Sequence, residues 1–234
     1  MVSINRPRED GLGATTSDGQ VDEVGISDET NAYEPEIFIV EDDLIAARVM
    51  GQIIDDMGHR THLFNSCEDF LEAYAANGEG CLVLDVGFPG MSGLDLLRTL
   101  CRSSCAPVTL VISGASDVAQ AVQLMKLGAL DYMEKPTPPE TFREGVSRMV
   151  QEARTRFEQS RTQSMAVDRL ASLTRRQQQI MTLVLAGFRN KHIAAELAIS
   201  QRTVENHRAR IMAKLGAKSI PAMTLTAYTA RTTG

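Results

Sequence analysis

Five polar residues with the chemistry of a phosphate-handling site stand at or just after the ends of short apolar segments. They are Glu41 and Asp42 after "IFIV", Asp85 at the end of "CLVLD", Ser113 at the end of "VTLVIS", and Lys135 after "LDYME". Three carboxylates brought together repel one another unless a cation lies among them, and an all-oxygen ligand set suits Mg²⁺. A hydroxyl and an ammonium beside them would bind phosphoryl oxygens. The combination favours a site where an Asp acts as nucleophile and becomes an acyl phosphate.

Each of these residues also has an ordinary structural explanation when it is taken singly. An Asp after a strand often caps the next helix, and a Lys before Pro usually lies on an exposed loop. Four segment ends that all carry residues suited to one chemistry make coincidence the weaker explanation. The elements around them must then bring the four ends together.

The segments that carry these residues indicate a parallel sheet. From Glu36 onward, short apolar segments alternate with segments of helical periodicity such as "LIAARVMGQIIDDM" and "DVAQAVQLMKLG". This alternation predicts βαβ units and an α/β fold with a doubly wound, five-stranded parallel sheet. Ligands of such sheets bind outside the carboxyl ends of the strands, where the polar residues would meet. The expected strands are "IFIV", "THLF", "CLVLDV", "VTLVIS" and "LDYM".

Three helix starts can be predicted from local signals. The segment "TPPE" places Thr137 as an N-cap and Glu140 three residues later, which predicts a helix running towards the 150s. Thr174 and Gln177 form a second capping box at the start of a long, all-helical segment. We expect Asp43 in the first turn of the helix after the first strand, where negative charge is favourable.

Composition limits the class of protein. A chain of 234 residues with 43% hydrophobic residues can bury two modest cores. Its apolar segments are shorter than the ~20 residues of a membrane span, and the amino terminus lacks the pattern of a secretory signal. We therefore expect a soluble cytoplasmic protein that has no membrane partner. No CxxC pair occurs, so we expect reduced structural thiols and no zinc site; the cysteines are Cys67, Cys81, Cys101 and Cys105.

Charge divides the chain into two parts. Residues 166–234 hold 11 Lys and Arg against 3 Asp and Glu, whereas residues 1–165 hold 13 against 27. The net charges are therefore plus 8 and minus 14, and only the basic part is expected to approach a polyanion. The predicted organisation is a disordered acidic tail (1–34), an α/β domain (35–150), a helical linker (151–168) and an all-α domain (169–234).

The α/β domain resembles the receiver domain of two-component response regulators. The motifs that carry the resemblance are "IVEDD", "LVLDVGFPGMSGLDLL", "VISGASD" and "DYMEKP". Their spacing also fits, with 43 residues from Asp42 to Asp85, 28 from Asp85 to Ser113 and 50 from Asp85 to Lys135. The resemblance implies that Asp85 is the phosphoacceptor. It implies that Asp42 binds Mg²⁺ directly, that Glu41 helps through water, and that the carbonyl of Gly87 is a further ligand.

The same resemblance implies the roles of the remaining receiver residues. Ser113 would be the switch hydroxyl, and Lys135 the cation that contacts the phosphoryl group. Tyr132 would be the aromatic side chain that rotates inward on phosphorylation. The peptide bond before Pro136 would be cis.

The all-α domain resembles the LuxR-type helix-turn-helix domain of the NarL/FixJ subfamily. The resemblance begins at "LTRRQQQIM" and places a scaffold helix in "NKHIAAELAIS" and a recognition helix in "QRTVENHRARIMAKL". If Val204, Ile211 and Leu215 face the core, helical geometry places Arg202, Asn206, Ala209 and Arg210 on the opposite face. Small and polar residues there suit a major groove.

Two kinds of DNA contact are expected from this helix and its scaffold. Glu205 can accept a hydrogen bond from a cytosine amino group, and Asn206 can pair with adenine. These two residues are our candidates for reading bases. Arg202 and Arg210, on the exposed face, are further DNA-binding candidates. Four other candidates are better placed to contact phosphates: Lys191, Thr203, Arg208 and Lys214.

We therefore expect a phosphorylation-controlled DNA-binding transcription regulator and not an enzyme. Its expected partners are a sensor histidine kinase, double-stranded DNA, a second copy of the chain when phosphorylated or on DNA, and RNA polymerase. A phosphatase with an Asp nucleophile is a weaker alternative, because such enzymes need an acid two residues on, where this chain has Gly87. A DNA-binding regulator controlled by a ligand or protein partner without phosphorylation remains the second alternative.

Overall fold

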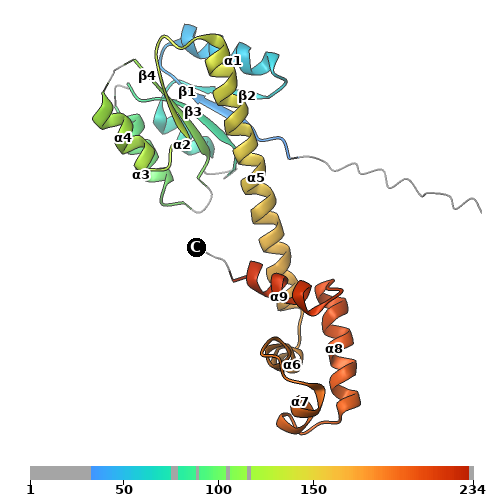
Figure 1. Ribbon diagram of the computed structural model, residues 1–234. Coiled ribbons are helices and arrows are strands. Elements are labelled where there is room, and N and C mark those ends of the chain that lie inside the picture. Colours follow the sequence, from blue (N-terminus) through green and yellow to red (C-terminus); the bar gives the residue numbers. More distant parts are fainter. Residues whose placement is uncertain (1–32, 75–78, 88–89, 104–105, 115–116, 232–234) are drawn as a thin grey trace, which may run out of the picture. The chain divides into compact units, whose positions relative to one another are not determined.

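The computed structural model describes residues 33–74, 79–87, 90–103, 106–114 and 117–231. Of the acidic tail expected over residues 1–34, only Tyr33 and Glu34 are among them, so the rest of that expectation lies outside the described residues. The described chain contains an α/β domain and an all-α domain, and one continuous helix runs from the first into the second (Figure 1).

The α/β domain contains a five-stranded parallel sheet in the order β2-β1-β3-β4-β5. This is the predicted doubly wound fold, and its strand order reverses between β1 and β3. The elements are β1 (Ile37–Val40), α1 (Leu44–Asp56), β2 (Thr61–Phe64), α2 (Cys67–Tyr74), β3 (Cys81–Asp85), α3 (Gly93–Leu100), β4 (Val108–Ser113), α4 (Val118–Lys126), β5 (Asp131–Glu134) and α5 (Pro139–Ala171).

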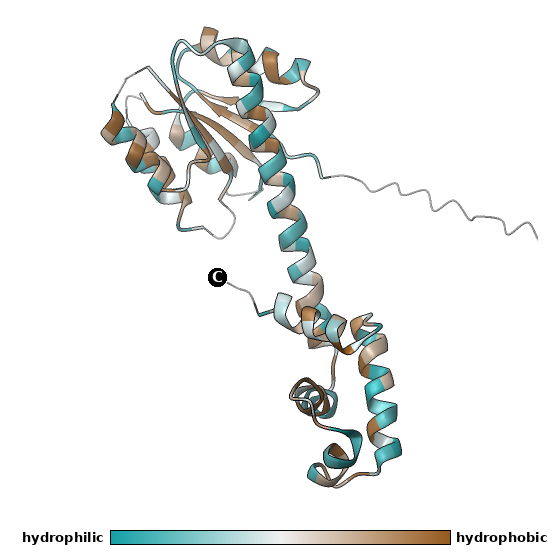
Figure 2. Ribbon diagram, viewed as in Figure 1, coloured by the Kyte–Doolittle hydropathy of each residue, from teal (hydrophilic) through white to brown (hydrophobic). Residues whose placement is uncertain are grey.

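Helices cover both faces of the sheet. On β1, Ile37 and Ile39 enter a core that includes residues of α1 and α5. Phe38 and Val40 point to the opposite face, where they enter a second core with residues of α2, α3 and α4. Because both faces are buried, the inner strands consist of apolar runs without regular alternation, and they stand out as brown strands in Figure 2.

Two of the predicted helix starts differ from the structure. Asp43 is the N-cap of α1 and does not lie in its first turn, because its Oδ1 accepts from the amides of Ile45 at 2.8 Å and Ala46 at 3.3 Å. The capping box at Thr137 was wrong, since Pro138 is the N-cap of α5 and has no side-chain capping bond. The Thr137 hydroxyl instead donates to the carbonyl of Glu134 at 2.9 Å.

Helix α5 continues without a break for 33 residues. The linker predicted for residues 151–168 therefore lies inside one helix. Its middle part is mostly hydrophilic, as the teal segment of Figure 2 shows, and contains no Gly or Pro. No helix among the described residues has the combination of length and apolar character that a membrane span requires.

The first described residues pack against α5. The ring of Tyr33 stacks on Phe157, with ring centroids 3.9 Å apart and an interplanar angle of 8°. Glu34 pairs with Arg154 and lies 3.5 Å from Nδ1 of His59. Burial, with smaller contributions from nearby acidic groups, raises the pKa of Tyr33 to about 12. Tyr33 therefore packs on α5 and Glu34, although exposed, is paired with Arg154 of α5, so neither belongs to a free tail.

The all-α domain has its own core. Its helices are α6 (Arg175–Leu185), α7 (Asn190–Glu196), α8 (Gln201–Leu215) and α9 (Ile220–Thr229). The capping box of Thr174 and Gln177 at the start of α6 is confirmed. The most buried core residues include Ile180, Ile193 and Val204.

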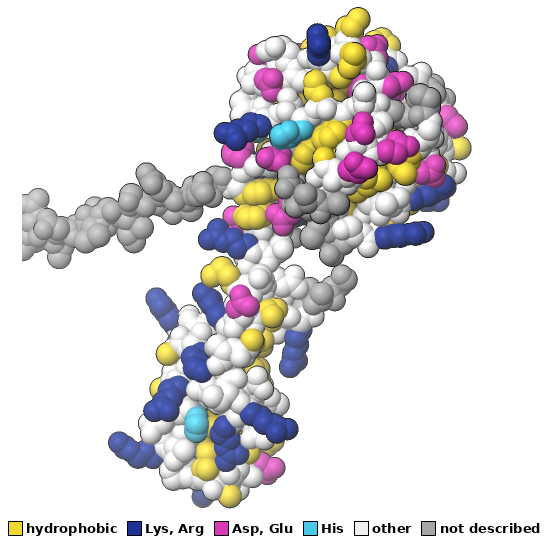
Figure 3. Space-filling model, turned by 180° about the vertical axis from the view of Figure 1, so that it is seen from behind, with side chains coloured by type: hydrophobic (Ala, Val, Ile, Leu, Met, Phe, Trp, Pro, Cys, Tyr) yellow, Lys and Arg dark blue, Asp and Glu magenta, His cyan; other side chains and the backbone are white. Residues whose placement is uncertain are grey.

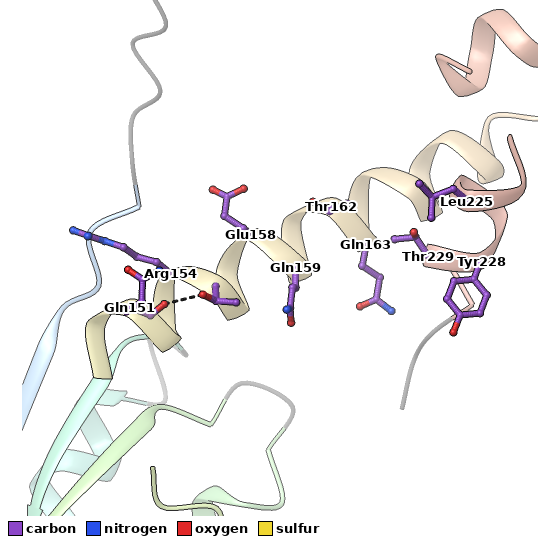
Figure 4. A pocket seen from close by; sticks show the side chains of 10 residues that line it. Gln151, Arg154, Glu158, Gln159, Thr162, Gln163, Leu225, Tyr228 and Thr229 are labelled. Atoms are coloured by element: carbon purple, nitrogen blue, oxygen red, sulfur yellow. Dashed lines mark hydrogen bonds between the residues drawn. The ribbon is translucent and has the colours of Figure 1, made fainter. Parts of the chain in front are cut away.

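A groove of about 690 Å³ is lined by mainly polar residues of α5 and by Leu225, Tyr228 and Thr229 of α9 (Figure 4).

Candidate functional site

The strand register brings the predicted polar residues to one edge of the sheet. Val40 of β1 is paired with Leu84 of β3, so Glu41, just after β1, and Asp85, the last residue of β3, lie at the same level. Ser113 at the end of β4 is buried, and its carbonyl accepts from the amide of Lys135 at 2.8 Å. Four separate segments therefore meet where the sequence predicted a single site.

Lys135 joins two carboxylates at this edge. Its Nζ lies 2.6 Å from Oε2 of Glu41 and 2.6 Å from Oδ2 of Asp85. The side chain of Glu41 is 1% exposed and that of Asp85 is 11% exposed, so both charges are largely removed from water. The peptide bond between Lys135 and Pro136 is cis, as the resemblance implied.

The two carboxylates differ in their pKa shifts. Burial and the neighbouring Asp85 charge raise the pKa of Glu41, and the hydrogen bond from Lys135 opposes this only in part. Burial would also raise the pKa of Asp85, but hydrogen bonds from Lys135 and from the Gly87 amide outweigh it and lower the pKa. Burial lowers the pKa of Lys135, yet bonds to both carboxylates leave it raised. Asp85 is thus held ionised beside an ammonium.

Glu41, Asp42 and Asp85 also form the acidic cluster expected of a cation site. One carboxylate oxygen from each lies within 4.8 Å of the others. Glu41 and Asp85 are buried, whereas Asp42 is exposed, so the cluster opens to solvent on one side. The donors are oxygens throughout, which is the set that Mg²⁺ prefers over softer metals. The residues present therefore fit the expected ion.

Tyr132, the predicted switch residue, packs on one face of the sheet. It is a half-buried residue of β5 that packs against the core on the α2, α3 and α4 side of the sheet. It also lines a groove with Val118, Val122 and Met125 of α4.

Helix α8 presents the expected polar face. Val204, Ile211 and Leu215 are at most 1% exposed and lie in the core of the all-α domain. The residues predicted on the opposite face, Arg202, Asn206, Ala209 and Arg210, are all exposed, and so is Glu205. In Figure 3, Lys and Arg side chains gather on the all-α domain, while Asp and Glu are more frequent over the α/β domain. The basic part of the sequence therefore gives the all-α domain a basic surface, and the acidic part gives the α/β domain a more acidic one (Figure 3).

Three of the candidate phosphate contacts already have protein partners. The hydroxyl of Thr203 lies 2.8 Å from that of Ser200, which caps α8. Arg208 donates to Oδ1 of Asn190 at 2.7 Å. Lys214 donates to the carbonyl of Ser172 at 2.6 Å and to a side-chain oxygen of α6. Lys191, at the start of α7, is exposed.

Known proteins share both domains with this chain. The family model "Response regulator receiver domain" matches residues 37–147. The family model "Bacterial regulatory proteins, luxR family" matches residues 171–227. Transcriptional regulatory protein FixJ of Bradyrhizobium diazoefficiens is 33% identical over 184 residues, which cover 79% of this chain and 90% of FixJ. Response regulator protein TmoT of Ectopseudomonas mendocina is 35% identical over 190 residues, covering 81% of this chain and 86% of TmoT. The structure of response regulator StyR matches with a TM-score of 0.76 and 31% identity, over 84% of this chain and 99% of StyR.

These matches span both domains and nearly the whole length of their relatives. The chain belongs to the NarL/FixJ subfamily of response regulators. It joins a receiver domain to a LuxR-type helix-turn-helix domain, and it is a phosphorylation-controlled DNA-binding transcriptional regulator in a histidine-kinase pathway. Both resemblances drawn from the sequence motifs are confirmed.

Two residues beside the loop after β3, Gly93 and Glu68, make close contacts that were not predicted from the sequence. A Cβ atom on Gly93, at the start of α3, would lie 2.8 Å from the carbonyl oxygen of Asp85 and 2.8 Å from Cα of Val86. Only glycine lets α3 begin so close to the end of β3. On the far side of the loop, Glu68 of α2 accepts from the amide of Met91 at 3.2 Å. The glycine in "MSGLDLL" was visible in the sequence, but the backbone it approaches was not.

Proposed function

We propose that Asp85 is the residue that receives the phosphoryl group. An oxygen of its ionised carboxylate would attack the phosphorus of a phosphohistidine; the new O–P bond forms as the N–P bond breaks, and the imidazole leaves. The observation that supports this most directly is the position of Asp85: a carboxylate at a strand end, paired with Lys135 and clustered with two other acids. Ser113 and Lys135 would bind the phosphoryl oxygens.

Glu41, Asp42 and Asp85 would hold Mg²⁺, with the carbonyl of Gly87 as a further ligand. When bound, the ion would neutralise negative charge on the carboxylates and on the incoming phosphoryl group. The Gly87 amide, which donates to Oδ1 of Asp85 at 3.1 Å, orients that carboxylate on its other side.

The exposed face of α1 supports an interaction with a kinase beside this site. Leu44, Ile45 and Val49 are 62%, 76% and 56% exposed, which is unusual for three large apolar side chains on one short helix. Ile45 and Val49 line a pocket that also includes Lys135 and Pro136. A sensor histidine kinase that packed a helix on this surface would place its phosphohistidine next to Asp85.

We further propose that α8 enters the major groove of DNA. Glu205 and Asn206 would read bases from its exposed face. The phosphate contacts would come from Lys191, Arg202, Thr203, Arg208 and Arg210. Two copies of the chain would associate when Asp85 is phosphorylated or when they bind DNA. The dimer would bind a DNA site with two-fold symmetry and would there be able to contact RNA polymerase.

One experiment tests these proposals together. The full chain is incubated with magnesium and acetyl phosphate, and phosphate incorporation and DNA affinity are both measured. The wild type should become labelled and bind DNA more tightly, whereas Asp85→Asn should do neither, because a carboxamide forms no acyl phosphate. Equal labelling of Asp85→Asn would place the acceptor elsewhere. Labelling of the wild type without any change in DNA affinity would favour a regulator controlled by a ligand or protein partner.

A further inference from the structure

The carboxyl ends of α5 and α8 each receive a cation from the other helix. Arg169, in the last turn of α5, donates from Nη1 to the carbonyl of Leu215, the last residue of α8, at 3.5 Å. Lys214, in the last turn of α8, donates from Nζ to the carbonyl of Ser172, the C-cap residue of α5, at 2.6 Å. The two helix ends are therefore capped reciprocally.

This arrangement has a clear physical basis. The last four carbonyls of a helix have no partners within the helix, and they carry the negative end of the helix dipole. A cation from a second helix satisfies one of those carbonyls and is itself attracted by the dipole. When each helix supplies the cation for the other, neither bond can form unless both helices remain intact to their ends. The pair of bonds therefore fixes the position of one helix end against the other.

A third helix is tied to the same point. Nζ of Lys214 also donates to Oε1 of Gln177 at 3.2 Å, and the same oxygen accepts from the amide of Thr174 at 2.9 Å. Gln177 is only 4% exposed, so this contact lies within the domain and is protected from water. The ammonium of Lys214 thus joins the end of α5, the start of α6 and its own helix α8.

We infer that Lys214 and Arg169 are positioning residues that hold α8 against the end of α5, and that Lys214 is not primarily a contact to DNA phosphates. This inference rests on the proposed role of α8 in entering the major groove. It assigns to Lys214 a role other than the one its place on the helix suggested, because its ammonium is directed at a carbonyl and an amide oxygen of the same chain. The orientation of α8, and through it DNA affinity, then depends on α5 remaining helical as far as Arg169.

The salt dependence of DNA binding separates the two roles of Lys214. Lys214→Met and Arg169→Met remove one cation each from the full chain and keep an apolar stem. If both are positioning residues, each variant should lose about two- to fivefold in DNA affinity at every salt concentration, with the salt slope unchanged. Lys191→Met is the matched control for a phosphate contact, and it should lower the slope by about 0.9. A slope that fell by the same amount in Lys214→Met would overturn the inference.

A second measurement does not depend on DNA. Hydrogen–deuterium exchange of the full chain should become faster over residues 170–174 and over residues 212–217 in both methionine variants. The double variant should show little further increase, because either loss opens the same pair of bonds. Lys214→Arg keeps a cation and should restore slow exchange. Exchange that rose only on the mutated helix would overturn reciprocal capping. If the wild type bound no DNA at all, the proposed role of α8 would fail, while the exchange result would still decide the capping.

Discussion

Nζ of Lys135 lies 2.6 Å from Oδ2 of Asp85, the position where a phosphoryl group would be attached. The same ammonium lies 2.6 Å from Glu41, so a single cation balances two buried carboxylates. Any change at Lys135 must therefore affect the electrostatics of the acidic cluster and, in the role we propose for Lys135, the binding of phosphoryl oxygens.

Lys135→Met should separate these two effects. Without the ammonium, Glu41 and Asp85 repel each other, so the free energy of unfolding in EDTA should fall by about 1–3 kcal/mol. Magnesium should bind more tightly than to the wild type, because no protein cation competes with it, and should restore part of the stability. Labelling by acetyl phosphate should nevertheless be slower. Calorimetric titration, thermal unfolding and labelling would check the three results; weaker magnesium binding would contradict this account.

Asp42→Asn should weaken magnesium binding, because it removes one of the three clustered carboxylate charges. A loss of about tenfold or more in affinity is expected. Asp43→Asn is the matched control: its side chain caps α1, and Asn is an equally good N-cap, so it should leave the affinity nearly unchanged. Equal losses in both variants would show that general charge, and not the cluster, determines binding.

Gly93→Ala should destabilise the receiver domain and disturb Asp85. Its Cβ would lie 2.8 Å from the carbonyl oxygen of Asp85, the last residue of β3, and 2.8 Å from Cα of Val86, and these backbone atoms cannot move as easily as a flexible side chain. Overpacking of this kind costs about 1–3 kcal/mol, and labelling should slow as well. Gly114→Ala is the control, because a Cβ there would meet no atom of the described residues within 4 Å. Calorimetry would measure the free energy of unfolding of both variants.

The cysteines should differ in reactivity. Burial, with some contribution from nearby acids, raises the pKa of Cys67 to about 11, and burial raises that of Cys81 to about 12. Only the thiolate is alkylated, and a raised pKa keeps the thiol protonated at pH 8. Iodoacetamide should therefore modify the exposed Cys101 in the native protein and spare Cys67 and Cys81. Mass spectrometry would locate the label. Modification of Cys81 in the native protein at the rate seen in urea-unfolded protein would contradict its burial.

Asn206→Ala should reduce discrimination between DNA sequences. Loss of a base contact should cost about 1–3 kcal/mol on the preferred site and little on random DNA. Arg210→Ala, on the same exposed face, should weaken binding to both and lower the salt slope. Fluorescence anisotropy with both DNAs would measure the difference. Equal losses in Asn206→Ala on the two DNAs would mean that another face of α8 reads the bases.

The receiver fold and its acidic edge could be predicted because their signals are local. Each inner strand is buried on both faces and therefore appears as an apolar run, and a parallel sheet brings every strand's carboxyl end to one edge. Glu41, Asp85 and Lys135 could be brought together on that basis alone. The pairing of one ammonium with two carboxylates could not, because it depends on side-chain directions.

The misplaced features had competing local explanations. The helical linker of 151–168 was predicted as a segment separate from the helix before it, but its residues include good helix formers and no Gly or Pro, so α5 continues through them without a break. At Thr137, the hydroxyl found a nearer acceptor in the carbonyl of Glu134. The partners of Lys214 are 42 and 37 residues away along the chain, so a helical wheel could give its direction but not what it meets.

The unbroken course of α5 also determines how this response regulator meets proteases. Trypsin cleaves after Arg and needs an extended stretch of several residues in its active site, so exposed loops are its usual targets. Arg154, Arg156 and Arg161 would be such targets if residues 151–168 formed an irregular linker, but all three lie inside one helix. Cleavage there requires the helix to unwind first, so the connection between the receiver and the DNA-binding domain is protected by its secondary structure.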